Sequence, residues 1–94
     1  MKAKAYQKGV VTMDYNYKIT GQIVGRLRTQ RGMSQEVLSG LSGVARSHLA
    51  MIETGSKNAN VDTLWRIAQA LEMKLSDLIK LIEYEHERPN AHRK

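Results

Sequence analysis

The chain of 94 residues provides one domain and has no room for a catalytic domain beside a binding domain. Its hydrophobic fraction of 41%, with one Trp and no Phe, suits aliphatic helices packed on one another, and no apolar run is long enough to span a membrane. The sequence has no cysteine, which excludes disulfides, thiolate zinc sites and cysteine nucleophiles; with no signal peptide expected, the expected location is cytoplasmic.

The net charge of +6 is confined to the N-terminal part of the chain. Residues 1–57 contain nine basic and three acidic side chains, whereas residues 58–94 contain six of each. A basic half suits a polyanion and a neutral half suits a partner helix, although many small soluble domains are basic without binding nucleic acid. Charge alone therefore does not decide the function.

Residues 1–17 are expected to form a mobile basic arm that carries Lys2, Lys4 and Lys8. Apolar and polar residues alternate from position 11 to position 17, so the end of this arm is compatible with a short strand. The folded domain is expected to span residues 18–87, followed by a polar tail over residues 88–94.

The first two helices are marked by residues at their ends. A helical apolar pattern begins at Ile19, and Gly32 is placed to end that helix. Ser34 is placed to cap a short second helix, which Gly43 ends. The residues expected to face inward on these two helices are Ile23, Val24, Leu27, Val37, Leu38 and Leu41.

Three further helices follow with short connections. The third begins near Ala45 and ends at Gly55, Asn60 and Ser76 are placed to cap the fourth and fifth, and the fifth must end before Pro89. The residues expected to face inward on them are Leu49, Ile52, Val61, Leu64, Ile67, Ala68, Leu71, Leu75, Leu78 and Ile82. The sequence therefore predicts an all-α domain of five helices.

The connection between the second and third helices is the most informative local feature. It consists of about three residues, Ser42 to Val44, which is too short for antiparallel stacking and leaves the two helices crossing steeply, as in a helix-turn-helix. Gly43 stands where the turn needs a left-handed residue, and Ser39 is small where the helices meet. The apolar residues expected to lock the pair are Leu38, Val44, Leu49 and Ile52. An ordinary helical hairpin inside a bundle is the alternative.

Longer motifs surround this turn, from Gly21 to Ile79: RxxRGMSQ, LSGVxRSxL, IExG, NxxVDTLWRIAQAL and LSDLI. This succession resembles the Cro/Xre-type helix-turn-helix repressors over about two-thirds of the chain without an insertion. The resemblance implies a lambda-repressor-like fold and a sequence-specific regulator of transcription, a repressor, that binds double-stranded DNA. It also implies a palindromic operator, read through residues 45–54 in the major groove, and no cofactor.

The resemblance assigns roles to individual residues. The positions that match base-contacting residues are Ala45, Arg46, Ser47 and Met51. Arg46 suits the O6/N7 edge of guanine, with a phosphate contact as the alternative, and Met51 can offer only apolar contact, for example to a thymine methyl group. The positions expected to contact phosphates are Ser34, Gln35, His48, Ser56, Lys57 and Asn58.

Two more positions, Arg28 and Glu53, match a partly buried ion pair between the first and third helices. The sequence also departs from the family in three places. Ala45 replaces a capping residue, Glu72 stands where a helix-ending glycine is common, and Gly25 stands where a helix former is usual. These departures put local geometry in doubt and remove no binding group.

The fifth helix is more apolar than one buried face requires, which indicates a partner helix. The residues expected to contribute to a dimer interface are Leu78, Ile79, Leu81, Ile82 and Tyr84, although Leu75, Leu78 and Ile82 can instead serve the core. A homodimer would place two recognition helices about 34 Å apart, one turn of DNA.

A protein-interaction module with the same fold, such as an antitoxin or an anti-regulator, is the alternative function. A protein-only module has little need to combine Gln35, Arg46 and Lys57 on a basic half. An enzyme is excluded because no catalytic set appears, and His48, His86 and His92 lack metal-ligand spacing. The operator, the regulated genes, activation against repression, and a restriction-modification, antitoxin or phage context all stay open.

Overall fold

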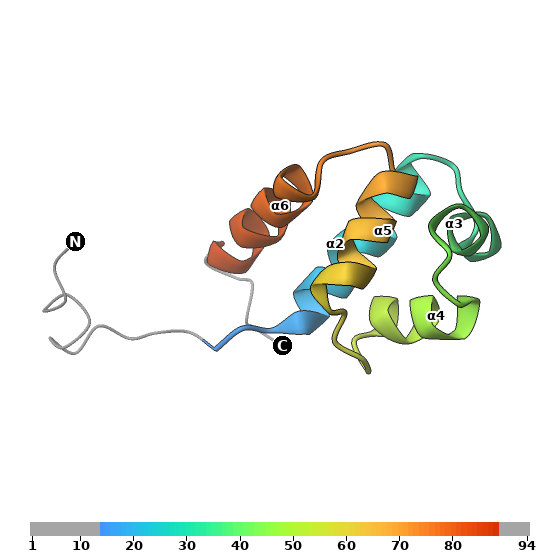
Figure 1. Ribbon diagram of the computed structural model, residues 1–94. Helices are drawn as coiled ribbons and strands as arrows, with labels where there is room; N and C mark the ends of the chain where they lie inside the picture. The colour runs from blue at the N-terminus through green and yellow to red at the C-terminus, as the bar shows by residue number, and fades with distance from the viewer. Residues whose placement is uncertain (1–13, 89–94) are drawn as a thin grey trace, which may run out of the picture.

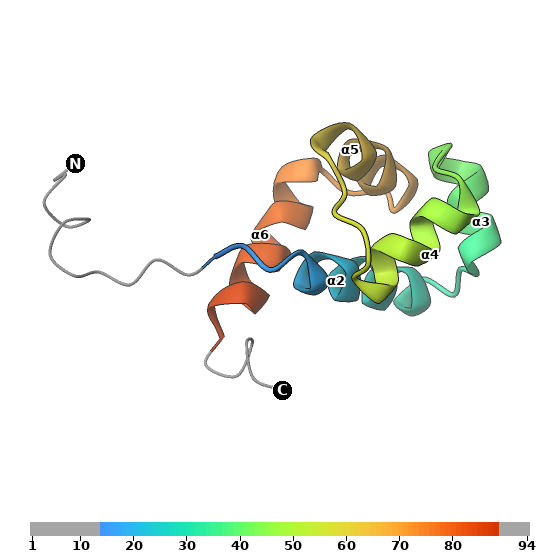
Figure 2. The same cartoon turned by 90° about the horizontal axis from the view of Figure 1, so that it is seen from below.

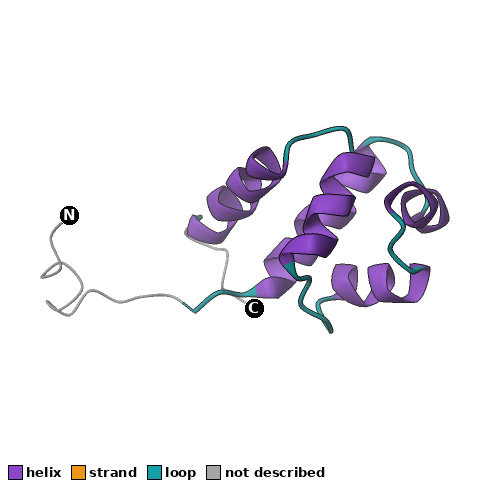
Figure 3. Ribbon diagram, in the orientation of Figure 1, coloured by secondary structure: helices purple, strands orange, loops and turns teal. Residues whose placement is uncertain are grey.

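The computed structural model describes residues 14–88, and every regular element within that range is an α-helix. The helices, coloured purple in Figure 3, are α2 (Tyr17–Gln30), α3 (Gln35–Ser42), α4 (Arg46–Thr54), α5 (Val61–Ala70) and α6 (Leu75–Glu87). The all-α prediction with five helices is therefore confirmed. The predicted arm residues 1–13 and tail residues 89–94 lie outside the described range. None of the helices over residues 14–88 is long and apolar enough to cross a membrane.

Helices α2 and α5 occupy the middle of the molecule in both views, with α6 at one end and the α3–α4 pair at the other (Figures 1 and 2). Their apolar faces meet in one core, as the helical periodicity predicts. The buried apolar residues are Ile19, Ile23, Val24, Leu27, Leu38, Val44, Leu49, Ile52, Ala59, Leu64, Ile67, Ala68, Leu71, Leu78 and Ile82. The core therefore draws on every helix, and α3 and α4 are fixed against the same interior as α6.

Three residues predicted to face inward are exposed instead. Val37 and Leu41 on α3 are 48% and 61% exposed, and Val61 on α5 is 68% exposed. Helix α3 has only eight residues, and its buried side consists of Leu38 and Ser42, one turn apart. Val61 is the first residue of α5 and precedes the turn that reaches the core. When only one row of residues on a short helix is buried, the apolar residues beside that row remain in solvent.

The helix caps agree with the prediction at two of three positions. Ser34 and Asn60 accept hydrogen bonds from the backbone N–H groups of Val37 (3.1 Å) and Thr63 (2.8 Å). Ser76 is not a cap: α6 begins at Leu75, and the residue before it, Lys74, makes no side-chain cap hydrogen bond. Leu75 packs against the core, so packing rather than a cap sets the start of α6.

The first helix begins earlier than expected because Asn16 caps it. The side-chain oxygen of Asn16 accepts a hydrogen bond from the backbone N–H of Lys18 (3.1 Å), and Tyr17 is the first helical residue. The predicted strand is therefore wrong for Tyr15 and Tyr17, and positions 11–13 lie outside the described residues. A local asparagine cap outweighs an alternating pattern of only four residues.

Helices α2 and α4 approach each other closely at Gly21. A Cβ atom on Gly21 would lie 1.9 Å from the backbone oxygen of Ile52, and one on Gly25 would lie 3.3 Å from the Glu53 carboxylate. Gly25 therefore makes room for Glu53, which explains why a helix former is absent there. At the end of α5, Glu72 adopts a left-handed conformation (φ 59°) that usually favours glycine.

We predict that Gly21→Ala destabilises the fold by about 2 kcal/mol or more, because the new methyl group must separate α4 from α2. Gly40→Ala is the matched control: Gly40 lies inside α3 with nothing within 4 Å of its Cβ position, so this change should stabilise by about 0.5–1 kcal/mol. Urea unfolding followed by circular dichroism measures both. Equal free energies of unfolding for wild type and Gly21→Ala would contradict the close approach.

Candidate nucleic-acid interface

The turn between α3 and α4 is closed by its own hydrogen bonds. Gly43 is left-handed (φ 75°), as predicted. The Ser39 hydroxyl donates to the carbonyl oxygen of Val44 (2.6 Å), and the Val44 N–H donates to the Ser42 hydroxyl (3.2 Å). The three connecting residues therefore need no water or partner to satisfy these groups, and the angle between the two helices is fixed locally.

The inner side of the motif is fully buried. The four residues predicted to lock the two helices together are at most 6% exposed: Leu38, Val44, Leu49 and Ile52. Because these side chains take the inner face of α4, its outer face is left to solvent. The predicted base-contacting residues are all exposed: Ala45, Arg46, Ser47 and Met51. Ala45 precedes α4 and makes no side-chain cap hydrogen bond, as its methyl group requires.

Arg46 makes an ion pair with an acidic residue on the neighbouring helix. Its Nε lies 3.2 Å from Oε2 of Glu36, and the two side chains are 57% and 70% exposed. The sequence prediction did not include Glu36, because nothing in the spacing of positions 36 and 46 shows that α3 and α4 bring them together.

The predicted phosphate-contacting residues fall into two places. Ser56, Lys57 and Asn58 are exposed in the loop after α4. The backbone N–H groups of Ser56 and Lys57 both donate to the carbonyl oxygen of Met51 (2.9 and 3.1 Å), which holds the start of this loop against α4. His48 is half-buried and borders a polar hollow of about 250 Å³ beside α5.

The other two positions lie at the start of α3. Ser34 caps the helix, and the side-chain amide of Gln35 donates to Glu53 Oε1 (3.0 Å). The amide of Gln35 is thus part of an internal network, which the sequence prediction did not anticipate. Its backbone position in the first turn of α3 still suits an anion.

The predicted ion pair between Arg28 and Glu53 is confirmed. Arg28 Nε and Nη2 donate to the two carboxylate oxygens of Glu53 (2.7 and 2.9 Å), and Nη1 donates to the carbonyl oxygen of Met33 (2.8 Å). The side chains are 15% and 8% exposed. Together with Gln35, this network joins α2, the connection to α3, and the end of α4.

The charge on Arg28 is fixed. The hydrogen bond to Glu53 raises the pKa of Arg28 above its ordinary value, against the smaller lowering effect of burial. A raised pKa adds stability below the unfolded-state value, and this stability is lost only when the pH rises through the folded-state value. Because both the folded-state and the unfolded-state pKa of Arg28 lie far above neutral pH, Arg28 contributes a constant positive charge across the neutral range.

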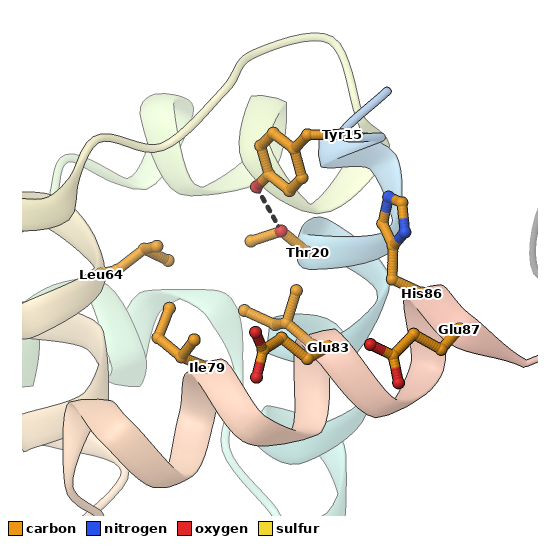
Figure 4. Close-up of a pocket in the computed structure, with 8 residues that line it drawn as sticks. Tyr15, Thr20, Leu64, Ile79, Glu83, His86 and Glu87 are labelled. Carbon is orange, nitrogen blue, oxygen red and sulfur yellow. Dashed lines mark hydrogen bonds between the residues drawn. The ribbon is translucent and has the colours of Figure 1, made fainter. Parts of the chain in front are cut away.

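A second exposed feature lies between α5 and α6, and we call it the α5–α6 groove. It consists of two hollows of about 690 and 390 Å³, and Ile79 and Glu83 line both of them. Trp65, which is 54% exposed, borders the larger hollow. The smaller hollow, shown in Figure 4, is closed by Tyr15 and His86, whose rings stack with centroids 6.0 Å apart. The sequence prediction missed Trp65, whose signal is a large aromatic residue one position outside the apolar face of α5.

The predicted dimer residues do not share one surface. Leu78 and Ile82 are buried inside the chain (0% and 5% exposed), so their assignment to an interface was wrong and the core alternative holds. Ile79 lies in the α5–α6 groove. Leu81 and Tyr84 are exposed by 40% and 68%, and at about 100° per residue they lie on the flank of α6 away from that groove.

Comparison with known proteins gives a consistent picture. A helix-turn-helix family model matches residues 24–78, more than half of the chain. An HTH-type transcriptional regulator of Sinorhizobium fredii is 36% identical over 62 residues, which cover 66% of this chain and 80% of that protein. The HTH-type transcriptional regulator SutR of Escherichia coli is 39% identical over 54 residues, which cover 57% of this chain and 30% of SutR.

Solved structures show the same fold. The restriction-modification controller protein C.AhdI from Aeromonas hydrophila is 35% identical, with a TM-score of 0.63, and the match covers 66% of this chain and 94% of C.AhdI. The controller protein C.Esp1396I is 22% identical, with a TM-score of 0.72 over 81% of this chain and 97% of that chain, and supports the fold alone. That protein has been solved as a tetramer with its natural 35 base-pair operator.

We predict that Glu53→Gln destabilises the fold by about 2–4 kcal/mol, because it leaves a charged and mostly buried Arg28 without its carboxylate. Asp62→Asn is the matched control, since the Asp62–Arg66 pair is more than half exposed and should contribute less than about 1 kcal/mol. Thermal unfolding at one protein concentration compares them. Equal shifts in melting temperature would contradict a structural role for Glu53.

Proposed function

Because the chain belongs to the helix-turn-helix family of DNA-binding transcriptional regulators, we propose that it reads a palindromic operator as a homodimer and represses transcription by occupying it. The observation that carries the proposal is the outer face of α4. Arg46, Ser47 and Met51 are exposed together on a helix whose inner face and turn are held rigidly. Such a helix can enter the major groove without rearrangement of the domain.

The groups around α4 suit the two sugar-phosphate backbones that border the groove. At one side, the first turn of α3 presents the backbone N–H groups of Gln35 and Glu36, which favour an anion. After the other end of α4, Lys57 and Asn58 are exposed in a loop held against Met51. Contacts of this kind position the helix, whereas Arg46, Ser47 and Met51 would read the bases.

A homodimer is supported by the α5–α6 groove. Trp65 and Ile79 give it an apolar centre, and an exposed tryptophan on a small domain is typical of an interface. Along the groove, Lys74 and Lys80 lie toward the beginning of α6, while Glu83 and Glu87 lie toward its end. The carboxylate end is the part shown in Figure 4.

This charge order favours a second copy as the occupant. A two-fold axis perpendicular to α6 makes the partner's α6 antiparallel, and the lysine end of one copy then faces the glutamate end of the other. A different protein would need a complementary order of charges by coincidence. The opposite flank of α6, with Leu81 and Tyr84, lies beside the Arg26–Glu85 ion pair and offers only two apolar side chains. We therefore place the dimer interface at the groove.

For DNA binding, we predict that affinity for random duplex DNA falls linearly with the logarithm of salt concentration, with a slope of about −0.9 per phosphate contacted. Lys57→Ala should make that slope shallower by about 0.9. Arg88→Ala removes the same charge at the far end of α6 and is the control (Figure 1). Fluorescence anisotropy of labelled DNA measures both. No binding at low salt would overturn the proposal and favour a protein-interaction module.

For the dimer, we predict that Trp65→Glu gives a monomer, because it places a charge at the apolar centre of the groove. Tyr84→Glu is the matched control, an exposed aromatic residue on the other flank of α6, and should leave the dimer intact. Sedimentation equilibrium measures the mass, and circular dichroism checks that both variants remain helical. A dimeric Trp65→Glu or a monomeric Tyr84→Glu would contradict the placement of the interface.

A further inference from the structure

We infer that Glu36 is a positioning residue for Arg46. Its carboxylate orients the Arg46 side chain so that the outer end of the guanidinium faces a guanine edge. The inference rests on the proposed function, because it takes Arg46 as a base-contacting residue of α4. The observation behind it is the ion pair between Arg46 Nε and Glu36 Oε2, at 3.2 Å, which joins the two helices across the outer face of the motif.

The atoms used by this ion pair decide what remains for DNA. A guanidinium has five N–H donors, one on Nε and two on each terminal nitrogen. Oε2 of Glu36 lies 3.2 Å from Nε as an ion pair, and within residues 14–88 neither Nη1 nor Nη2 of Arg46 makes a hydrogen bond, so their fork is left for another partner. Guanine presents two acceptors, O6 and N7, to the major groove, and a two-pronged donor matches them. Glu36 therefore lies beside the nitrogen that end-on recognition of guanine does not need.

The negative charge of Glu36 is unexpected on the outer face of α3 and α4, which is proposed to face DNA. Helices α3 and α4 contain only two acidic residues, and the other one, Glu53, is buried against Arg28. Glu36 is instead 70% exposed, next to Gln35 in the turn proposed to meet a phosphate. A carboxylate there weakens binding to any DNA backbone. If it also orients the base-reading arginine, it raises the ratio of specific to non-specific affinity.

The size of the effect follows from the exposure of the pair. An exposed ion pair shifts an equilibrium by at most about five-fold. A two-pronged contact between arginine and guanine discriminates by about five- to 150-fold. Glu36 thus biases the orientation of Arg46 without locking it, and its removal should lower discrimination less than the removal of Arg46.

The test begins with a duplex selected from random DNA by the wild-type protein. Affinities are then measured for that duplex, for versions with each guanine replaced, and for random duplex. Arg46→Ala identifies the base pair that depends on Arg46. At that pair Glu36→Ala should lower discrimination about two- to five-fold, while binding to random duplex stays equal or becomes tighter. Glu36→Gln keeps an oxygen acceptor and should recover part of the discrimination.

Controls separate charge from position. Asp77→Ala and Asp77→Asn make the same charge changes at an exposed residue of α6 and should leave discrimination unchanged. In the Arg46→Ala background, Glu36→Ala should have no further effect on discrimination, because its influence acts through Arg46. Thermal unfolding of each variant checks that α3 is intact.

Three outcomes would overturn the inference. If Glu36→Ala binds the selected duplex more tightly with unchanged discrimination, the carboxylate merely competes with DNA for Arg46. If its effect persists without Arg46, Glu36 acts on the DNA itself. If the wild-type protein binds no DNA, the proposed function fails and this inference fails with it; the first two outcomes leave the proposed function standing.

Discussion

The carboxylate of Glu53 is the point on which the orientation of α4 depends. It accepts hydrogen bonds from Arg28 on α2 and from Gln35 on α3, while its own backbone belongs to α4. Gly25 leaves the space in which it lies, and Gly21 lets the backbones of α2 and α4 meet one turn away. A buried charge tolerates few geometries, because each unpaired N–H or oxygen is expensive once water is excluded. This network therefore ties the end of α4 to α2 and α3 in addition to the apolar packing.

The short motif has a second constraint, which is its own turn. The left-handed Gly43 and the hydroxyl groups of Ser39 and Ser42 satisfy the connection locally, while Leu49 and Ile52 hold α4 from within. Because the inner face of α4 packs in the core, side chains on its outer face make no core contacts. Exposed residues such as Arg46, Ser47 and Met51 can then change without loss of the fold.

Much of this could be predicted from the sequence because the signals are local. Helix periodicity, the caps at Ser34 and Asn60, and the glycine at position 43 each act within a few residues, and the structure confirms them. The Arg28–Glu53 pair spans 25 positions, and only resemblance to a family predicted it. The buried face of a short helix was harder to predict. Val37 and Leu41 follow the same apolar period as Leu38, but they lie outside the one row of buried residues on α3.

Other features depend on how distant helices meet and leave no trace in spacing. The roles of Gly21 and Gly25 come from the approach of α4, and the pairing of Glu36 with Arg46 comes from the angle between α3 and α4. The apolar residues of α6 are the clearest case. Periodicity showed that α6 has more apolar residues than its buried face needs. Only the positions of α5 and α2 show which of the remaining ones lie in the α5–α6 groove and which lie on the opposite flank.

The division of α6 matters for DNA because α5 joins both surfaces. It packs against α3 on one side and forms the wall of the α5–α6 groove with Trp65 on the other. A single module of this size would contact few phosphates and bases, which is why the proposed function takes two copies acting together. If the groove holds the partner, the distance between the two recognition helices is set through α5 and the Glu53 network. The same rigid core would then set both the orientation of α4 and the distance between the two half-sites.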